Sequence, residues 1–154
     1  MPLYLINLSD AFPDEYKKKF ASDNFKLGAV IKCYCPIADK EKRMILMGHK
    51  FDKKSIALVH INSEVNEIFF PTEYLKSLHL PLKCAGREYL THDSFVHCGQ
   101  LILRKYAEVY KLFESTPAIL LGHVSEADYK DIRNIIKGAK TISPADKKEF
   151  GLFL

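Results

Sequence analysis

The sequence predicts a mostly β fold that also contains helices: a small β-barrel with one helix before it and one after it. Two observations lead to this prediction. Short runs rich in apolar and β-branched residues follow one another between Phe25 and Val124, and charged or turn-forming segments separate them. A helical pattern precedes these runs and a second one follows them. Short strands at close spacing with helices outside them are typical of small barrels.

Length and composition indicate one globular domain. A chain of 154 residues can bury a core without disulfides or metals, and 47% hydrophobic with 27% charged residues is an ordinary balance for such a domain. We therefore expect a single domain over residues 1–154. It divides into an N-terminal arm and helix (1–24), the barrel with its C-terminal helix (25–141) and a short tail (142–154).

Charge and apolar runs limit the surroundings in which we expect the protein to work. No run approaches the roughly 20 apolar residues needed to span a bilayer, so no membrane partner is expected. The first residues, MPLYLINLSD, lack the basic region and cleavage site of a secretion signal, which indicates a cytoplasmic protein with reduced cysteines. The net charge of +4 allows an anionic partner such as RNA without requiring one.

The first half of the chain is expected to contain one helix and several short strands. The helix is predicted over Phe12–Ser22, where acidic residues occupy the first turn. A weak strand is expected at Glu67–Pro71 and an edge strand at Leu78–Cys84, because the proline in the latter has no N–H to donate to a sheet. The clearest strands of this half are Leu27–Pro36, Arg43–His49 and Ser55–Ser63.

The second half is expected to end in a helix. One strand is predicted over Ser94–Leu103 and another over Ala118–Val124, and Arg104–Glu114 between them fits either a strand or a helix. Ser125–Asp128 has the form of a capping box, and apolar residues then recur at helical spacing as far as Ala139.

The stretch LTHDSFVHCGQL, Leu90–Leu101, concentrates chemically active side chains in twelve residues. It is either a catalytic or metal-binding cluster or a half-buried strand. Strand periodicity places Ser94, Val96, Cys98 and Gln100 on one face and Phe95, His97, Gly99 and Leu101 on the other. We interpret the stretch as architectural, with Cys98 as a small buried residue.

A zinc site is the alternative for the cysteines. Cys33 and Cys35 would share one strand face, and two of Cys84, Cys98 and His97 would complete four ligands. The paired C-x₂-C spacing that is usual in structural zinc sites is absent from the sequence. No metal and no cofactor are therefore expected.

Five short segments, taken in order, carry a resemblance to a known family. They are Gly28–Ile31 (GAVI), Arg43–Met47 (RMILM), Val59–Ser63 (VHINS), Ser94–Gln100 (SFVHCGQ) and Leu121–Val124 (LGHV) with the helix after it. In this order the chain resembles the MazF/PemK family of toxin endoribonucleases, whose SH3-like barrel is shared with the CcdB gyrase poisons. The resemblance covers roughly residues 25–141.

The chain departs from the family pattern at its expected active-site loop. Where the family carries glycines, an arginine and then a proline, this sequence has Ala38–Lys42, Arg43 and Met44. The family's threonine after the third strand is replaced by Asn62, and Glu67–Leu78 is an additional segment.

The resemblance implies a toxin that cleaves single-stranded RNA without a metal. The ribose 2′-hydroxyl would attack its own phosphodiester and leave a 2′,3′-cyclic phosphate and a 5′-hydroxyl. Such a reaction needs a proton acceptor, a cation beside the developing phosphorane charge and an acid for the leaving oxygen. The family also implies a homodimer and a cognate antitoxin protein as partners.

Carried onto this sequence, the resemblance makes Arg43 the expected cation, since its planar fork binds two phosphate oxygens. Lys42 would assist it, or would replace it if Arg43 turns away, and Lys40 would help to bind RNA. The alternative for Arg43 is a surface charge at the start of a strand.

The expected proton acceptors are His60 and Glu41, and Asn62 or Ser63 would hold the phosphate or orient the attacking hydroxyl. The alternatives are a partly buried structural histidine and a simple turn at the end of a strand. Tyr34, Phe51 and Phe69 are available as stacking platforms for bases or as core residues.

The competing hypothesis is a barrel without catalysis. The missing glycine-rich loop, the absent proline and Asn62 in place of threonine all favour a protein- or nucleic-acid-binding module, including a gyrase-directed toxin. Both toxin interpretations predict a dimer, since the resemblance implies a substrate groove that is formed across two subunits.

Overall fold

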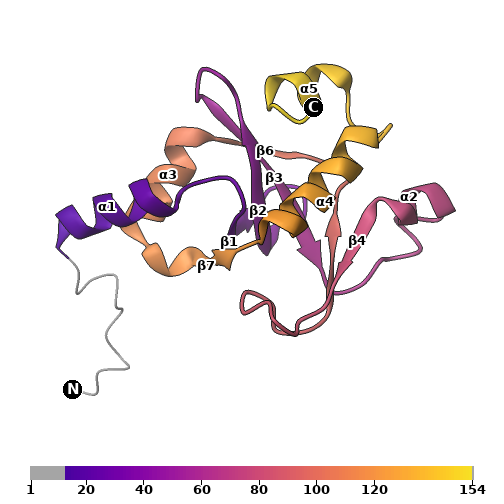
Figure 1. The fold of residues 1–154 in the computed structure, drawn as a ribbon, viewed down its shortest axis with the longest axis horizontal. Helices are drawn as coiled ribbons and strands as arrows, with labels where there is room; N and C mark the ends of the chain where they lie inside the picture. Colours follow the sequence, from indigo (N-terminus) through magenta and orange to yellow (C-terminus); the bar gives the residue numbers. More distant parts are fainter. Residues whose placement is uncertain (1–12, 154) are drawn as a thin grey trace.

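The computed structural model describes residues 13–153, so the expected N-terminal arm lies outside the described residues. Figure 1 shows a central sheet with helices on both of its faces. The chain runs in the following order: α1 (Asp14–Asn24), β1 (Ala29–Cys35), β2 (Lys40–His49), β3 (Ser55–Asn62), α2 (Glu73–Ser77), β4 (His79–Leu82), β5 (Ser94–His97), β6 (Ile102–Lys105), α3 (Tyr106–Ser115), a 3-10 turn (Pro117–Ile119), β7 (Leu120–His123), α4 (Glu126–Gly138) and α5 (Pro144–Glu149).

The sheet has seven antiparallel strands in the order β4-β5-β3-β2-β1-β7, and β6 pairs with the edge of β3 beside β5. In the part of the chain that the structure describes, β4 does not pair with β7, so the predicted closed barrel is wrong: the fold is mixed α/β with an open sheet. Both edge strands are only four residues long, and Pro81 in β4 has no N–H to continue the ladder. The edge position predicted for this proline-containing strand is confirmed.

Two predicted strands are corrected. The strand expected over Ser94–Leu103 is two strands, because a turn at Cys98–Gly99 separates β5 from β6. β5 then pairs with the last residues of β3 and β6 with the first, so both share one edge of that long strand. Glu67–Pro71, expected as a weak strand, is a turn. The ambiguous segment Arg104–Glu114 contains the end of β6 and most of α3.

Each face of the sheet carries its own core. Helix α4 and the chain after it bury Ile132, Ile136 and Leu152 against one face. Helices α1 and α3 bury Phe25 and Phe113 against the other face. Figure 1 shows α1 and α3 on one side of the sheet and α4 and α5 on the other. The α1/α3 pair covers β1, β6 and the adjoining halves of β2 and β3, which leaves the other end of this face open.

The C-terminal elements are capped and packed. Ser125 Oγ accepts a hydrogen bond from the Asp128 backbone N–H at 3.1 Å, so the predicted helix start is confirmed. The tail forms α5 and then buries Phe150 and Leu152 in the core. Gly48 on β2 allows this approach, because a Cβ there would lie 2.4 Å from the Phe150 carbonyl oxygen.

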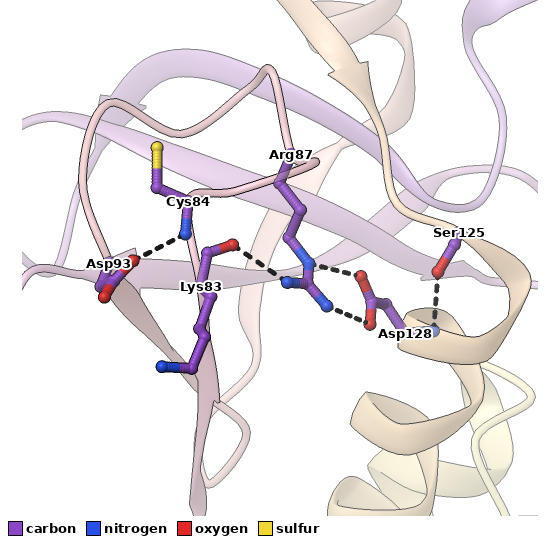
Figure 2. Close-up of polar contacts among 6 residues, drawn as sticks. All are labelled: Lys83, Cys84, Arg87, Asp93, Ser125 and Asp128. Carbon is purple, nitrogen blue, oxygen red and sulfur yellow. Dashed lines mark hydrogen bonds and ion pairs between the residues drawn. The ribbon is translucent and has the colours of Figure 1, made fainter.

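The loop between β4 and β5 is fastened to α4 by a bidentate ion pair, shown in Figure 2. Arg87 Nε and Nη2 donate to the two carboxylate oxygens of Asp128 at 2.8 and 3.0 Å, and Nη1 donates to the Lys83 carbonyl at 2.9 Å. Asp93 accepts from the Cys84 backbone N–H at 2.8 Å and closes the loop. We call Arg87, Asp128 and their partners the loop–helix joint.

Candidate functional site

A cleft lies on the open end of the α1/α3 face. Its volume is about 620 Å³. Strands β2, β3 and β5 form its floor, and the segment between β3 and α2 forms a wall. Its lining residues are Ile37, Ala38, Lys40, Lys42, His60, Asn62, Ser63, Glu64, Asn66, Phe69, Phe70, His97 and Gln100.

A lysine–asparagine pair spans two strands at one end of the cleft. The β2–β3 register aligns Met44 with His60, and the next pair on the same face is Lys42 with Asn62. Lys42 Nζ donates a hydrogen bond to the Asn62 side-chain oxygen. Burial and then the charge of Lys40 lower the pKa of Lys42. Strand pairing therefore holds an ammonium group beside a side-chain amide in the cleft.

Three buried histidines continue this face across three neighbouring strands. His60 lies on β3, His97 on β5 and His79 on β4. The rings of His79 and His97 are stacked, with centroids 4.5 Å apart, and His60 lies 5.2 Å from His97. The Phe70 ring packs edge-on against His79 and His97 at 4.3 and 4.9 Å. We call these three side chains the histidine stack.

The stack is held neutral at ordinary pH. Burial, then the charges of Lys42 and His79, lowers the pKa of His60 to about 4. Burial, then His79 and His60, lowers the pKa of His97 to about 3. Burial also lowers the pKa of His79, although its Nδ1 donates to the Leu75 carbonyl at 3.0 Å.

Hydrogen-bond partners are missing where the stack meets the cleft. Neither ring nitrogen of His60 has a partner in the described residues, and the side chain is 8% exposed. A neutral imidazole carries one donor and one acceptor, and an unpartnered buried polar group is costly. His60 therefore presents an unused donor and an unused acceptor at the floor of the cleft.

A smaller cavity of about 210 Å³ lies on the opposite face at the same end of β2. Arg43 and Glu41 alternate with Lys42 along the strand, so both line this second cavity and neither lines the cleft. Arg43 is half-buried, and its Nε has no partner among residues 13–153. Lys40, Lys42, Asn62 and Ser63 line both cavities.

The structure thus brings the predicted site residues to one end of the sheet but divides them between its two faces. His60, Lys42 and Asn62 face the cleft, while Arg43 and Glu41 lie on the other side. Of the two arrangements expected for the cation, the geometry matches Lys42 in the cleft with Arg43 turned away. His60 is buried, as its structural alternative expected, and also lines the cleft.

Sequence reasoning missed several cleft residues. His97 was expected only as part of a strand or as a zinc ligand, and His79 was given no role. Glu64, Asn66 and Gln100 also line the cleft or its rim. Strand periodicity placed His97 on the same face as Phe95. No local pattern indicated that three histidines from different strands would stack.

The aromatic platforms expected for bases prove to be surface residues. Phe51 is fully exposed on the β2–β3 hairpin, and Tyr34 is 49% exposed on β1. Phe69 is 73% exposed, and it alone of the three lines the cleft.

The cysteines are not brought together as the zinc alternative required. Cys33 and Cys35 are buried under α1 and α3, whereas Cys98 and Cys84 belong to the core on the other face. Within the described ranges, no group of three or more histidine, cysteine or acidic side chains is arranged to hold a metal ion. Cys98 is fully buried, and burial raises the pKa of its thiol to about 12, so it is the small core residue expected.

Comparison with models of known protein families finds no match to this chain, and comparison with curated proteins finds no similar sequence. No helix in residues 13–153 has the length and apolar character needed to cross a bilayer. The site must therefore be interpreted from its own chemistry.

Proposed function

We propose that the chain is a metal-independent endoribonuclease that cleaves single-stranded RNA in the cleft by attack of a ribose 2′-hydroxyl on the adjacent phosphodiester. The observation that carries the proposal is the Lys42–Asn62 pair beside the neutral His60. Lys42 supplies the cation and His60 the proton acceptor, Asn62 adds a hydrogen-bonding anchor, and the leaving 5′-oxygen takes its proton from solvent water.

The cation in this proposal is Lys42 rather than Arg43. The Lys42 ammonium lies in the cleft with Lys40 nearby, and two positive charges at one end attract a phosphodiester. An ammonium stabilises phosphorane charge as a point charge, without the two-point geometry of a guanidinium. Arg43, on the other face, is assigned to the path of the RNA beyond the scissile bond.

Asn62 and Ser63 would orient the phosphate or the attacking hydroxyl, since both line the cleft beside Lys42. His60 is the proposed acceptor of the 2′ proton, because its low pKa leaves a ring nitrogen unprotonated at neutral pH. Glu64, an exposed carboxylate at the rim of the cleft, is a second acceptor in reach of solvent.

Through the MazF/PemK resemblance, the same proposal includes a cytoplasmic toxin, a homodimer and an antitoxin partner. Exposed apolar residues flank the cleft on two sides: Ile37 from the β1–β2 turn and Phe69 from the segment after β3. A protein that covered these residues would block access to Lys42, as an antitoxin is expected to do.

One observation favours the non-catalytic alternative. A histidine whose pKa is about 4 is a weak base, and His60 is almost completely buried. A cleft that binds RNA without cutting it is therefore the second candidate function.

A cleavage assay in EDTA separates the two candidates. A long single-stranded RNA is incubated with the purified protein, and cut ends are mapped and tested for a cyclic phosphate. The mapped site is then rebuilt with one 2′-deoxynucleotide on the 5′ side of the cut. We expect discrete cuts in EDTA that the single deoxy substitution abolishes. If several unrelated RNAs bind to the protein and remain uncut, the endoribonuclease proposal is excluded and the RNA-binding function is favoured.

A further inference from the structure

One wall of the cleft comes from residues 64–70 after β3, of which 67–70 belong to the segment that is additional to the family pattern. A tight turn begins this wall: Asn66 accepts hydrogen bonds from the backbone N–H groups of Ile68 (to Oδ1, 2.8 Å) and Phe70 (to the carbonyl, 2.9 Å). Phe70 is anchored against the rings of His79 and His97. The backbone is thus fixed on both sides of the residue between them.

That residue, Phe69, is held out over the cleft. It is 73% exposed although its neighbour Phe70 is packed against the histidine stack. An exposed phenylalanine on an anchored turn, beside a cavity that contains two lysines, provides a π-face close to a cationic site. Single-stranded nucleic acids are bound by this combination of aromatic platforms and positive charge.

Hydrogen-bonding groups lie near this platform. Gln100, directly after the β5 turn, is exposed, lines the cleft and offers an amide donor and an amide acceptor. His60 offers a further donor and acceptor at the buried floor, and both of its ring nitrogens lack partners in the described structure. Side-chain amides of this kind make paired hydrogen bonds to base edges.

The dimensions of the sheet fit one nucleotide. Lys42 is on β2 and His97 on β5, with β3 between them, so the two ends of the cleft are separated by two strand spacings, about 10 Å. A nucleotide whose phosphate lies at the lysines would reach the aromatic end with its base. The polar and aromatic ends of the cleft therefore suit the two parts of a single unpaired nucleotide.

We propose that the segment 64–70 forms a nucleobase pocket, in which an unpaired base of RNA stacks on Phe69 and is selected by hydrogen bonds to Gln100, while its phosphate lies at Lys40 and Lys42. The proposal rests on RNA being the substrate and names the residues that determine its sequence preference. Phe69 supplies affinity for every base, because each base has a π-face. Gln100 supplies selectivity, because the base edges differ in their donors and acceptors.

The test measures binding without cleavage. Four homopolymeric oligonucleotides that carry fluorine in place of every 2′-hydroxyl are titrated into the wild type and into Phe69→Ala, Phe69→Trp and Gln100→Ala. Because these strands cannot undergo 2′-hydroxyl attack, the result is independent of whether the protein is a nuclease. Phe51→Ala is the matched control, since Phe51 is fully exposed on a hairpin outside the cleft.

We expect Phe69→Ala to weaken binding of all four oligonucleotides by roughly 5- to 150-fold. Phe69→Trp should bind as tightly as the wild type, and Phe51→Ala should leave binding unchanged. Gln100→Ala should reduce the preference among the four bases by a similar factor while the weakest-bound oligonucleotide keeps its affinity. Equal effects of Phe69→Ala and Phe51→Ala, or an unchanged base preference in Gln100→Ala, would overturn the pocket. Absence of binding by the wild type would also overturn it, whereas the nuclease proposal is decided separately by the cleavage assay.

Discussion

The cleft and the loop–helix joint are two polar regions of the same small domain, and they differ in how their polar groups are satisfied. In the joint, all three guanidinium nitrogens of Arg87 donate hydrogen bonds, two of them to Asp128. In the cleft, both ring nitrogens of the buried His60 lack partners within the described residues, and so does Nε2 of His79 in the histidine stack behind it.

This difference distinguishes polar side chains that stabilise the fold from polar side chains that are available to a ligand. Satisfied polar groups stabilise a connection, here between the β4–β5 loop and α4. Unsatisfied buried groups lower stability, and they persist where they serve another purpose, such as contact with a ligand. The two regions also differ in which charge state they favour. Hydrogen bonds from Arg87 lower the pKa of Asp128 and so favour the charged carboxylate. Burial lowers the pKa values of the cleft histidines and so favours the neutral imidazole.

The largest expected effect is acid destabilisation through the histidine stack. In the unfolded chain a histidine has a pKa of 6.5, whereas His60 and His97 in the fold have pKa values of about 4 and about 3. Between these values the unfolded state binds more protons, so stability falls as pH falls below 6.5, and the loss is nearly complete near pH 4 for His60 and near pH 3 for His97. His60 contributes roughly 3 kcal/mol and His97 roughly 5 kcal/mol to that loss.

Urea unfolding at intervals between pH 7.5 and pH 5, above the range where most carboxylates titrate, measures this slope. The variant His97→Phe keeps an aromatic ring between His79 and Phe70 and should remove roughly a third to a half of it, since His60 and His79 remain. The control His92→Gln alters an exposed histidine outside the stack and should leave the slope unchanged. An equal slope in His97→Phe and the wild type would contradict the assignment of neutral buried histidines.

A second effect concerns the faces of β2. Lys42→Ala should lower RNA cleavage by roughly 10²- to 10³-fold, the usual loss when one group that stabilises transition-state charge is removed. Arg43→Ala should have a smaller effect on the rate, because Arg43 lines the other cavity. Single-turnover cleavage of one defined RNA measures both variants. Lys111→Ala, an exposed lysine on α3, controls for the change in net charge. A larger loss in Arg43→Ala than in Lys42→Ala would reverse the assignment of the cation.

A smaller effect is expected in the joint. Arg87→Ala removes a bidentate ion pair whose side chains are 26% and 13% exposed, and it should destabilise the fold by about 1–3 kcal/mol. Thermal unfolding measures the loss, and RNA cleavage by the folded fraction should be unchanged. Lys76→Ala is the control, since its pairs with Glu67 and Glu73 at 3.4 and 3.7 Å involve carboxylates that are 83% and 95% exposed and are of lower value. Reduced cleavage at full folding would show that the joint also serves the cleft.

The smallest effect is expected at the helix caps. Ser125→Ala leaves the Asp128 backbone N–H without its side-chain partner and should cost about 1 kcal/mol. Ser143→Ala at the start of the short α5 should have a similar or smaller effect on thermal unfolding. A loss of several kcal/mol in Ser125→Ala would mean that the cap also orders the Asp128–Arg87 pair.

The sequence alone determined the features that depend on neighbours along the chain. The Ser125 cap and the helix after it follow from spacing within a few residues, as does the edge character of the strand that contains Pro81. Strand alternation also placed His60 and Asn62 on one face. The Phe69 platform was among the aromatic candidates, although its position in the cleft was not predicted.

Only the tertiary structure decided which strands became neighbours. The histidine stack requires the registers of β3 with β5 and of β5 with β4, and these registers join segments that lie far apart in the chain. The break between β5 and β6 and the open sheet depend in the same way on how β3 shares its edge. Local periodicity determines the face on which a side chain lies, but it contains no information about the register of distant strands. The set of side chains that meet in the site is therefore decided by the pairing of those distant strands.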